Sequence, residues 1–140
     1  MMLKAPEPLR VLDTSVIVRY LSNDLPALAA RARALIESDA ALGITAVALL
    51  EAVFVLRRAP YDYAREAVVD ALVDLLQRQN IRGVGVDSEE AALALLLCGP
   101  SSAVNFGDAL IAATARSAGL TEGYSFDARF GRAGLSASSP

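Results

Sequence analysis

Four carboxylates that are far apart in the sequence lie where apolar segments of the chain end, begin or are interrupted. They are Asp13, Glu51, Asp108 and Asp127. Carboxylate oxygens are hard ligands that favour Mg²⁺ or Mn²⁺ over zinc. A cluster of them suits phosphate-ester hydrolysis, in which one metal ion activates water and a second stabilises the leaving oxygen. These acids therefore indicate metal-dependent phosphoryl chemistry, provided that the fold brings them together.

The residue types that the chain lacks narrow its chemistry further. It contains no histidine, one lysine (Lys4) and one cysteine (Cys98). Catalysis by Ser-His-Asp or Cys-His groups, a histidine-containing zinc site and an intrachain disulfide are therefore excluded. Lys4 lies near the N-terminus, where we expect no catalytic role for it. Because carboxylates, hydroxyls and arginines remain, a bound cation is the expected source of positive charge and activated water.

Composition indicates a folded domain with an aliphatic core. Hydrophobic residues make up 54% of the 140 residues and aromatic residues 6%, which suits helices packed over a buried sheet. We expect one domain over residues 1–140, with loose termini at 1–7 and 136–140. No apolar run approaches the roughly 20 residues that span a membrane, and the start of the chain lacks the apolar stretch of a secretion signal. A cytoplasmic protein is therefore expected.

Short β-like runs alternate with helical patterns along the chain, which predicts an α/β fold with a central, mainly parallel sheet of four to five strands. The strands are expected at 9–12, 44–45, 84–86, within 120–126 and around Leu135. The helices are expected at 16–21, 26–36, 46–58, 61–78, 88–98 and 106–118. Thr14 or Ser15 can cap the first helix, and Asp87 or Ser88 the fifth.

Each acid has a structural explanation beside the catalytic one. Asp13 and Asp127 follow strands, at the sheet edge where ligands bind, but either can equally cap a helix or form a turn. Asp108 lies near a helix N-terminus, where the helix dipole favours an acid. Glu51 is the most informative, because its helix is otherwise apolar and is expected to be buried, where a lone carboxylate is costly unless paired, protonated or bound to metal. The alternative explanation for Glu51 is a solvent-facing position on an incompletely buried helix.

Topology favours a common location for the four acids. Two follow strands and two lie in apolar helices that begin at the same sheet edge, so a right-handed parallel arrangement brings all of them to one end of the sheet. Without cations, the converging carboxylates would repel one another and some of their pKa values would rise. A metal centre at this edge is therefore predicted.

The segments around the acids resemble the acidic motifs of PIN-domain nucleases, in the order of that family and over nearly the whole chain. The closest likeness is to the VapC-type toxins of toxin–antitoxin pairs. The matching segments are Val11-Leu12-Asp13-Thr14-Ser15, Glu51 after Ile44-Thr45, Phe106-Gly107-Asp108-Ala109-Leu110-Ile111-Ala112-Ala113, and Tyr124-Ser125-Phe126-Asp127.

The resemblance implies a three-layer α/β/α fold and Mg²⁺- or Mn²⁺-dependent cleavage of RNA. By the same likeness, Asp13 and Asp108 are the principal metal ligands. Glu51 binds metal or orients the nucleophilic water, and Asp127 completes the cluster directly or through a metal-bound water. Ser15 and Ser125 match hydroxyl positions of the motifs that can hold further waters, or they are caps.

The resemblance further implies a homodimer and inhibition by a cognate VapB-type antitoxin whose tail occupies the groove of the toxin. Apolar surface on the helices within 16–36 and 61–76 suits either contact, although core packing explains most of it. The net charge of −3 and the absence of a conspicuous basic patch argue mildly against nucleic-acid binding. Candidate phosphate contacts, each explained as well by solvated surface charge, are Arg19, Arg57, Arg58, Arg129 and Arg132.

Other classes fit the chain less well. A haloacid-dehalogenase-type phosphotransferase needs a second Asp where Ser15 stands, and a receiver domain needs a lysine that Lys4 is misplaced to supply. The Gly83-Val84-Gly85 segment lacks the third glycine of a dinucleotide-binding loop. The serious rivals are a catalytically silent PIN-like binding module, a PIN nuclease of RNA processing without a toxin role, and a DNA nuclease, which usually carries larger insertions.

Overall fold

A computed structural model describes residues 8–140, and within them it contains six α-helices, one 3₁₀ helix and five short strands. The expected alternation of strands and helices is confirmed; the expectation of a loose segment at 1–7 lies outside the described residues. In chain order the elements are β1 (Arg10–Val11), α1 (Thr14–Ser22), α2 (Pro26–Ile36), β2 (Leu42–Thr45), α3 (Ala46–Arg57), α4 (Arg65–Leu76), β3 (Ile81–Val84), α5 (Ser88–Cys98), α6 (Phe106–Ser117), β4 (Glu122–Tyr124), η1 (Ala128–Ala133) and β5 (Ser136–Ser138).

The strands pair in parallel, as the sequence predicts, but they form two sheets instead of one. One sheet has the order β1-β2-β3, with Arg10 opposite Leu42 and Leu42 opposite Ile81. The other consists of β4 and β5, with Glu122 opposite Ser136. The predicted α/β class with parallel strands is therefore confirmed, and only the expectation of one sheet of four to five strands is corrected. Sequence patterns mark strands through their apolar runs, but the choice of pairing partner depends on packing between distant segments.

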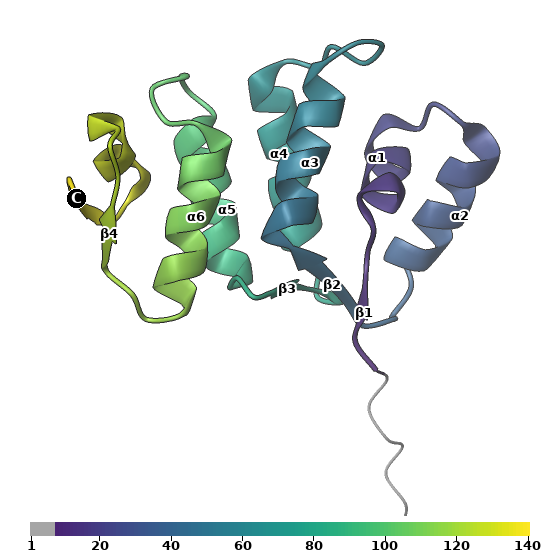
Figure 1. Ribbon diagram of the computed structural model, residues 1–140. Coiled ribbons are helices and arrows are strands. Elements are labelled where there is room, and N and C mark those ends of the chain that lie inside the picture. The colour runs from purple at the N-terminus through teal and green to yellow at the C-terminus, as the bar shows by residue number, and fades with distance from the viewer. Residues whose placement is uncertain (1–7) are drawn as a thin grey trace, which may run out of the picture.

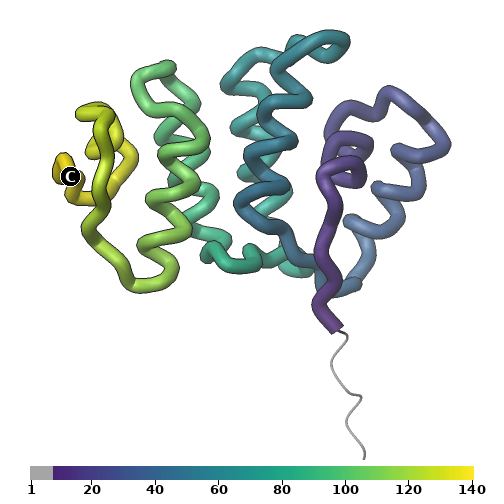
Figure 2. The backbone as a smooth tube through the Cα atoms, viewed as in Figure 1, coloured from purple at the N-terminus to yellow at the C-terminus, as the bar shows by residue number. Residues whose placement is uncertain are grey.

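The helices stand side by side above the three-stranded sheet, with α1 and α2 at one end of the row and β4 and η1 at the other (Figure 1). Neighbours in this row pack on one another: α1 contacts α2 and α3, α3 contacts α4 and α6, and α6 contacts α5 and η1. The tube in Figure 2 shows that α3 ends and α6 begins on the side of the molecule away from this sheet. The C-terminal end of α3 and the N-terminal end of α6 are thus on the same side.

Among the element boundaries that differ from expectation, two are explained by local backbone conformation. Helix α4 begins at Arg65 rather than near Tyr61, since Asp62 has a positive φ of 51° that a right-handed helix cannot contain. Strand β3 ends at Val84 rather than Val86, since Gly85 has a φ of 72° and turns the chain toward α5.

The C-terminal segment is ordered by pairing rather than loose. Ser136 N–H donates to the carbonyl of Thr121 at 3.0 Å, and Ser125 N–H donates to the carbonyl of Ser138 at 3.0 Å. Phe130, buried in η1, belongs to the same apolar core as the helices. The expectation of a loose tail over 136–140 missed these contacts, because a serine-rich tail does not by itself predict a strand.

None of the helices described for residues 8–140 combines the length and apolar character needed to cross a membrane.

Candidate active site

Asp13 lies two residues after the end of β1 and caps α1. It has extended backbone angles (φ −72°, ψ 152°), and its Oδ2 accepts the Ser15 hydroxyl at 2.6 Å and the Ser15 N–H at 3.2 Å. The expected caps, Thr14 and Ser15, instead lie in the helix. The Ser15 hydroxyl, and then the Ser15 N–H, hold the pKa of Asp13 below its ordinary value of 3.8. The exposed carboxylate is thus ionised and fixed in orientation.

Glu51 is exposed, so the argument for its burial is corrected. Helix α3 buries only one face, through Ala48, Leu49, Ala52, Val53 and Leu56. Glu51 lies on the opposite face between Val47 and Phe54, which are exposed although they are apolar. An exposed carboxylate needs no partner to offset desolvation. The apolar character of α3 misled the prediction because no described element covers this side of the helix.

Asp108 is the third residue of α6 and is held by Asn105, the N-cap residue of that helix. Asn105 Oδ1 accepts the Asp108 N–H at 2.7 Å, while Asn105 Nδ2 donates to Asp108 Oδ2 at 2.9 Å. Asn105 thus caps the helix as the first residue of a capping box does, but Asp108 accepts from the side-chain amide of Asn105 and not from its backbone N–H. Asp108 is half-buried, and Asn105 fixes the direction in which its carboxylate points.

Asp127 caps η1 and forms an ion pair with Arg129. Its Oδ1 accepts the Arg129 N–H at 2.9 Å and the Arg129 Nε at 3.2 Å, and its Oδ2 accepts Arg129 Nη2 at 3.1 Å. These bonds hold the pKa of Asp127 below its ordinary value, chiefly through the guanidinium. The Ser125 hydroxyl accepts the Asp127 N–H at 3.0 Å. Both serines named from the sequence therefore contact the acid beside them.

The elements that carry the four acids pack in an unbroken row, from α1 through α3 and α6 to η1. Asp108 and Asp127 lie near enough that both raise the pKa of Arg129, with the hydrogen bond to Asp127 as the largest cause. Over residues 8–140, however, no three carboxylate or thiol side chains are close enough together to hold a metal ion. The donor types suit a hard divalent cation, but their placement here does not form a complete set of ligands.

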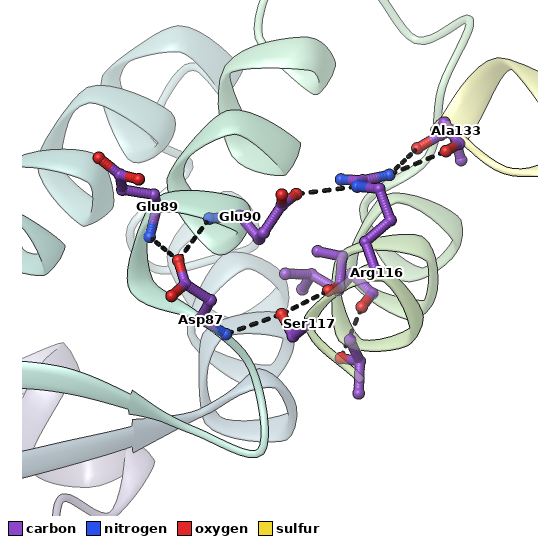
Figure 3. A network of polar contacts seen from close by, with 10 residues as sticks. Asp87, Glu89, Glu90, Arg116, Ser117 and Ala133 are labelled. Atoms are coloured by element: carbon purple, nitrogen blue, oxygen red, sulfur yellow. Dashed lines mark hydrogen bonds and ion pairs between the residues drawn. The ribbon is translucent and has the colours of Figure 1, made fainter. Parts of the chain in front are cut away.

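Arg116 anchors the segment that carries Asp127 to the helices, as Figure 3 shows. Its Nε donates to Glu90 of α5 at 2.8 Å, and its Nη1 donates to the carbonyls of Ala133 at 3.3 Å and Gly134 at 3.1 Å. One side chain of α6 thus joins α5 to the end of η1. This anchoring fixes the C-terminal segment beside α6, whose first turn carries Asp108.

The five candidate RNA-contacting arginines fall into two groups. Arg19 donates to Asp24 and Tyr61, and Arg129 is paired with Asp127. Arg57, Arg58 and Arg132 are exposed, and their side chains form no hydrogen bond or ion pair with any described residue. Only this second group is free to bind phosphate without losing a partner within the described chain.

Residues that the sequence interpretation missed support Asp108 and the helix that carries it. Asn105 precedes Asp108 by three residues, a capping-box spacing that offered a usable signal. Arg65 joins the end of α5 and the following loop to the start of α6: it donates to the carbonyls of Cys98 at 2.5 Å and Val104 at 2.9 Å and lies over the Phe106 ring at 4.4 Å. No spacing in the sequence predicts this long-range contact.

Comparison with known proteins assigns the chain to a family. The sequence model of the PIN-domain family matches residues 10–135, which include all four acids. The chain therefore belongs to the PIN-domain family, whose members are generally nucleases and commonly depend on divalent metal ions. No curated protein and no solved structure matches the chain.

Proposed function

We propose that this chain is an endoribonuclease that depends on Mg²⁺ or Mn²⁺ and hydrolyses phosphodiester bonds of RNA. The observation that carries the proposal is the PIN-domain match, because it spans Asp13, Glu51, Asp108 and Asp127 in one chain without histidine. The ordering of three of these acids by hydrogen bonds from neighbouring side chains supports it. Asp13 and Asp108 are proposed as the principal ligands, with Glu51 and Asp127 completing the cluster.

A divalent cation bound by these acids would supply an activated water and charge stabilisation at the phosphate. Within the chain itself, Ser15 keeps Asp13 ionised and oriented, and Asn105 performs the same orienting role for Asp108. Arg129 neutralises Asp127. The acids lack a complete ligand geometry in the present arrangement, and cation binding is expected to draw them together by removing their mutual repulsion.

We further propose that the enzyme acts in the cytoplasm as the toxin of a type II toxin–antitoxin pair, as a homodimer and under control of a VapB-type antitoxin. The likeness of the acidic motifs to VapC toxins supports this role. The exposed Leu25, Leu28 and Leu35 at α2 offer an apolar surface for such protein contacts. Expression of the wild-type chain should arrest bacterial growth, and expression of the Asp108→Asn variant should not.

The test of the enzymatic proposal is cleavage of single-stranded RNA with saturating Mn²⁺. Asp13→Asn and Asp108→Asn should each lower the cleavage rate by about 100-fold or more, because a metal ligand supports several kcal/mol of charge stabilisation in the transition state. Asp74→Asn, an exposed acid on α4, is the matched control and should cleave normally. Circular dichroism should show the same helix content in all four proteins. Wild-type rates in both site variants would refute the assignment.

A second candidate is a PIN-like module that binds RNA or protein without cleaving. The observation that favours it is the absence, among the described residues, of three acids close enough for one metal. RNA binding by the wild-type chain without any cleavage, at every Mn²⁺ concentration up to saturation, would support this candidate over the first.

A further inference from the structure

A hollow of about 530 Å³ lies between the C-terminal end of α3 and the N-terminal end of α6. Its lining includes three arginines and, among the described residues, no acid. The residues that matter here are Phe54, Arg57, Arg58, Arg65, Asn105 and Phe106. We call this hollow the α3–α6 groove.

The arginines of the groove differ in whether their guanidinium groups are already bound to other residues. Arg65 is committed to the carbonyls of Cys98 and Val104 and to the face of Phe106, so it forms a fixed positive wall. Arg57 and Arg58 are exposed, and within residues 8–140 neither guanidinium has a hydrogen-bond or ion-pair partner. The guanidinium groups of Arg57 and Arg58, beside that of Arg65, therefore make the groove suitable for an anion. A guanidinium group can donate two parallel hydrogen bonds to the oxygens of one phosphate.

An aromatic ring stands at the same groove. Phe54 lines it, yet 54% of the residue is accessible to solvent. Single-stranded nucleic acids bind to sites that combine a positive channel with aromatic rings on which bases stack. Each unit of a nucleic-acid strand carries both a base and a phosphate, so one strand uses the ring and the arginines together. The combination therefore favours a nucleic-acid strand as the occupant.

The groove leads to two of the proposed catalytic acids. Glu51 and Phe54 share the exposed face of α3, about 4.5 Å apart along its axis, and Arg57 and Arg58 follow at the C-terminal end of the same helix. On the other side, Asn105 lines the groove and also donates to the carboxylate of Asp108. A strand held in the groove therefore has a path to both acids.

We propose that the α3–α6 groove is an RNA subsite, in which a base of the substrate stacks on Phe54 while Arg57 and Arg58 contact the adjacent phosphates. The proposal rests on the proposed function, because RNA is the substrate named there. It assigns separate tasks to the chain: the acids cleave, and the groove holds the single strand next to the bond to be cut.

The test is RNA binding measured by fluorescence anisotropy with a labelled twelve-nucleotide oligoadenylate in EDTA, where cleavage cannot occur. Arg57→Gln with Arg58→Gln should weaken binding at least tenfold at low salt. The same double variant should reduce the slope of log K against log salt by about 1.4, since each lost phosphate contact on a single strand removes about 0.7. Phe54→Leu should weaken binding about fivefold or more, and Phe54→Tyr should bind like the wild type because it keeps the ring.

The matched control is Arg31→Gln with Arg82→Gln, which removes two exposed positive charges that do not line the groove. Equal weakening by this control would overturn the proposal, because it would show that only total charge matters. Wild-type binding by the groove variants, or no binding by the wild-type chain, would also overturn it.

The same measurements distinguish failure of the subsite from failure of the nuclease proposal. If the groove variants lose binding while the wild-type chain never cleaves RNA, the subsite is supported and the nuclease proposal alone fails. If the groove variants bind normally while Asp13→Asn abolishes cleavage, the nuclease proposal stands without the subsite.

Discussion

Arg129 holds both carboxylate oxygens of Asp127, with Nε at 3.2 Å from Oδ1 and Nη2 at 3.1 Å from Oδ2. The guanidinium therefore lies where a cation bound by Asp127 would lie. Asp108 also acts on this guanidinium and helps to raise its pKa, after the larger effect of Asp127. Arg129 thus places a positive charge that acts on both Asp127 and Asp108.

Arg129→Gln should strengthen Mn²⁺ binding, because the cation no longer has to displace a guanidinium from Asp127. The gain should be at most about fivefold, since exposed ion pairs are weak and screened by solvent. Isothermal titration of Mn²⁺ at pH 7 measures it directly. Arg132→Gln is the control, since Arg132 acts on Asp127 only through its charge, without a hydrogen bond. Weaker binding by Arg129→Gln would show that this side chain positions Asp127 for the metal instead of competing with it.

Replacement of Asn105 should separate helix capping from the orientation of Asp108. Asn105→Ala loses the cap and should lower the free energy of unfolding by about 1 kcal/mol. Asn105→Ser keeps a capping oxygen but cannot donate an amide hydrogen to Asp108 Oδ2. It should therefore unfold in urea like the wild type, yet cleave RNA about tenfold more slowly, as is typical when the partner of a metal ligand is lost.

A different result for Asn105→Ser would be equally informative. If it cleaves at the wild-type rate, the amide of Asn105 serves only the helix. If it unfolds as easily as Asn105→Ala, its loss of activity cannot be assigned to the orientation of Asp108.

The stability of the chain should depend on pH through Asp24. The Tyr61 hydroxyl donates to Asp24 Oδ2 at 2.7 Å, and this bond, followed by that from Ser22, lowers the pKa of Asp24 from its ordinary value of 3.8. A lowered pKa stabilises the folded state above pH 3.8, and this stabilisation is lost as pH falls through the folded pKa. Tyr61→Phe should therefore lower the free energy of unfolding at pH 7 and change it less at pH 2.

Urea unfolding at both pH values checks this expectation. Tyr63→Phe is the control, because the Tyr63 hydroxyl has no hydrogen-bond partner in the described part of the chain. An equal loss of stability at pH 7 and pH 2 in Tyr61→Phe would mean that the ionised form of Asp24 is not the acceptor that matters.

The sequence predicted well those features that depend on neighbouring residues. Asp87 caps α5 and accepts the N–H groups of Glu89 and Glu90, and Gly99 follows its last residue, as the local pattern indicated. The start of α2 at Pro26 and the position of Asp13 after β1 follow from equally local signals. Such boundaries are set by hydrogen bonds between residues that are close to one another in the sequence.

Features that depend on distant segments were not predictable in the same way. The apolar sequence of α3 does not reveal that no element within residues 8–140 covers one of its faces, so Glu51 was expected to be buried. The pairing of β4 with β5 rather than with the other strands depends on packing across the fold. The Arg57–Arg58 pair gains its neighbours in the groove only when α3 and α6 meet.

Glu51 offers the sharpest contrast between the sequence interpretation and the structure. If it were buried alone, Glu51→Gln would remove a costly charge and raise stability markedly. Because it is exposed, the substitution should change the free energy of unfolding by no more than about 0.5 kcal/mol. If Glu51 binds metal or orients water as proposed, the same variant should cleave RNA about 100-fold more slowly. Urea unfolding and Mn²⁺-dependent cleavage, with the exposed Glu66→Gln as control, decide between these cases. Full activity in Glu51→Gln would show that Glu51 has no role in cleavage. The proposed metal-binding cluster would then consist of Asp13, Asp108 and Asp127.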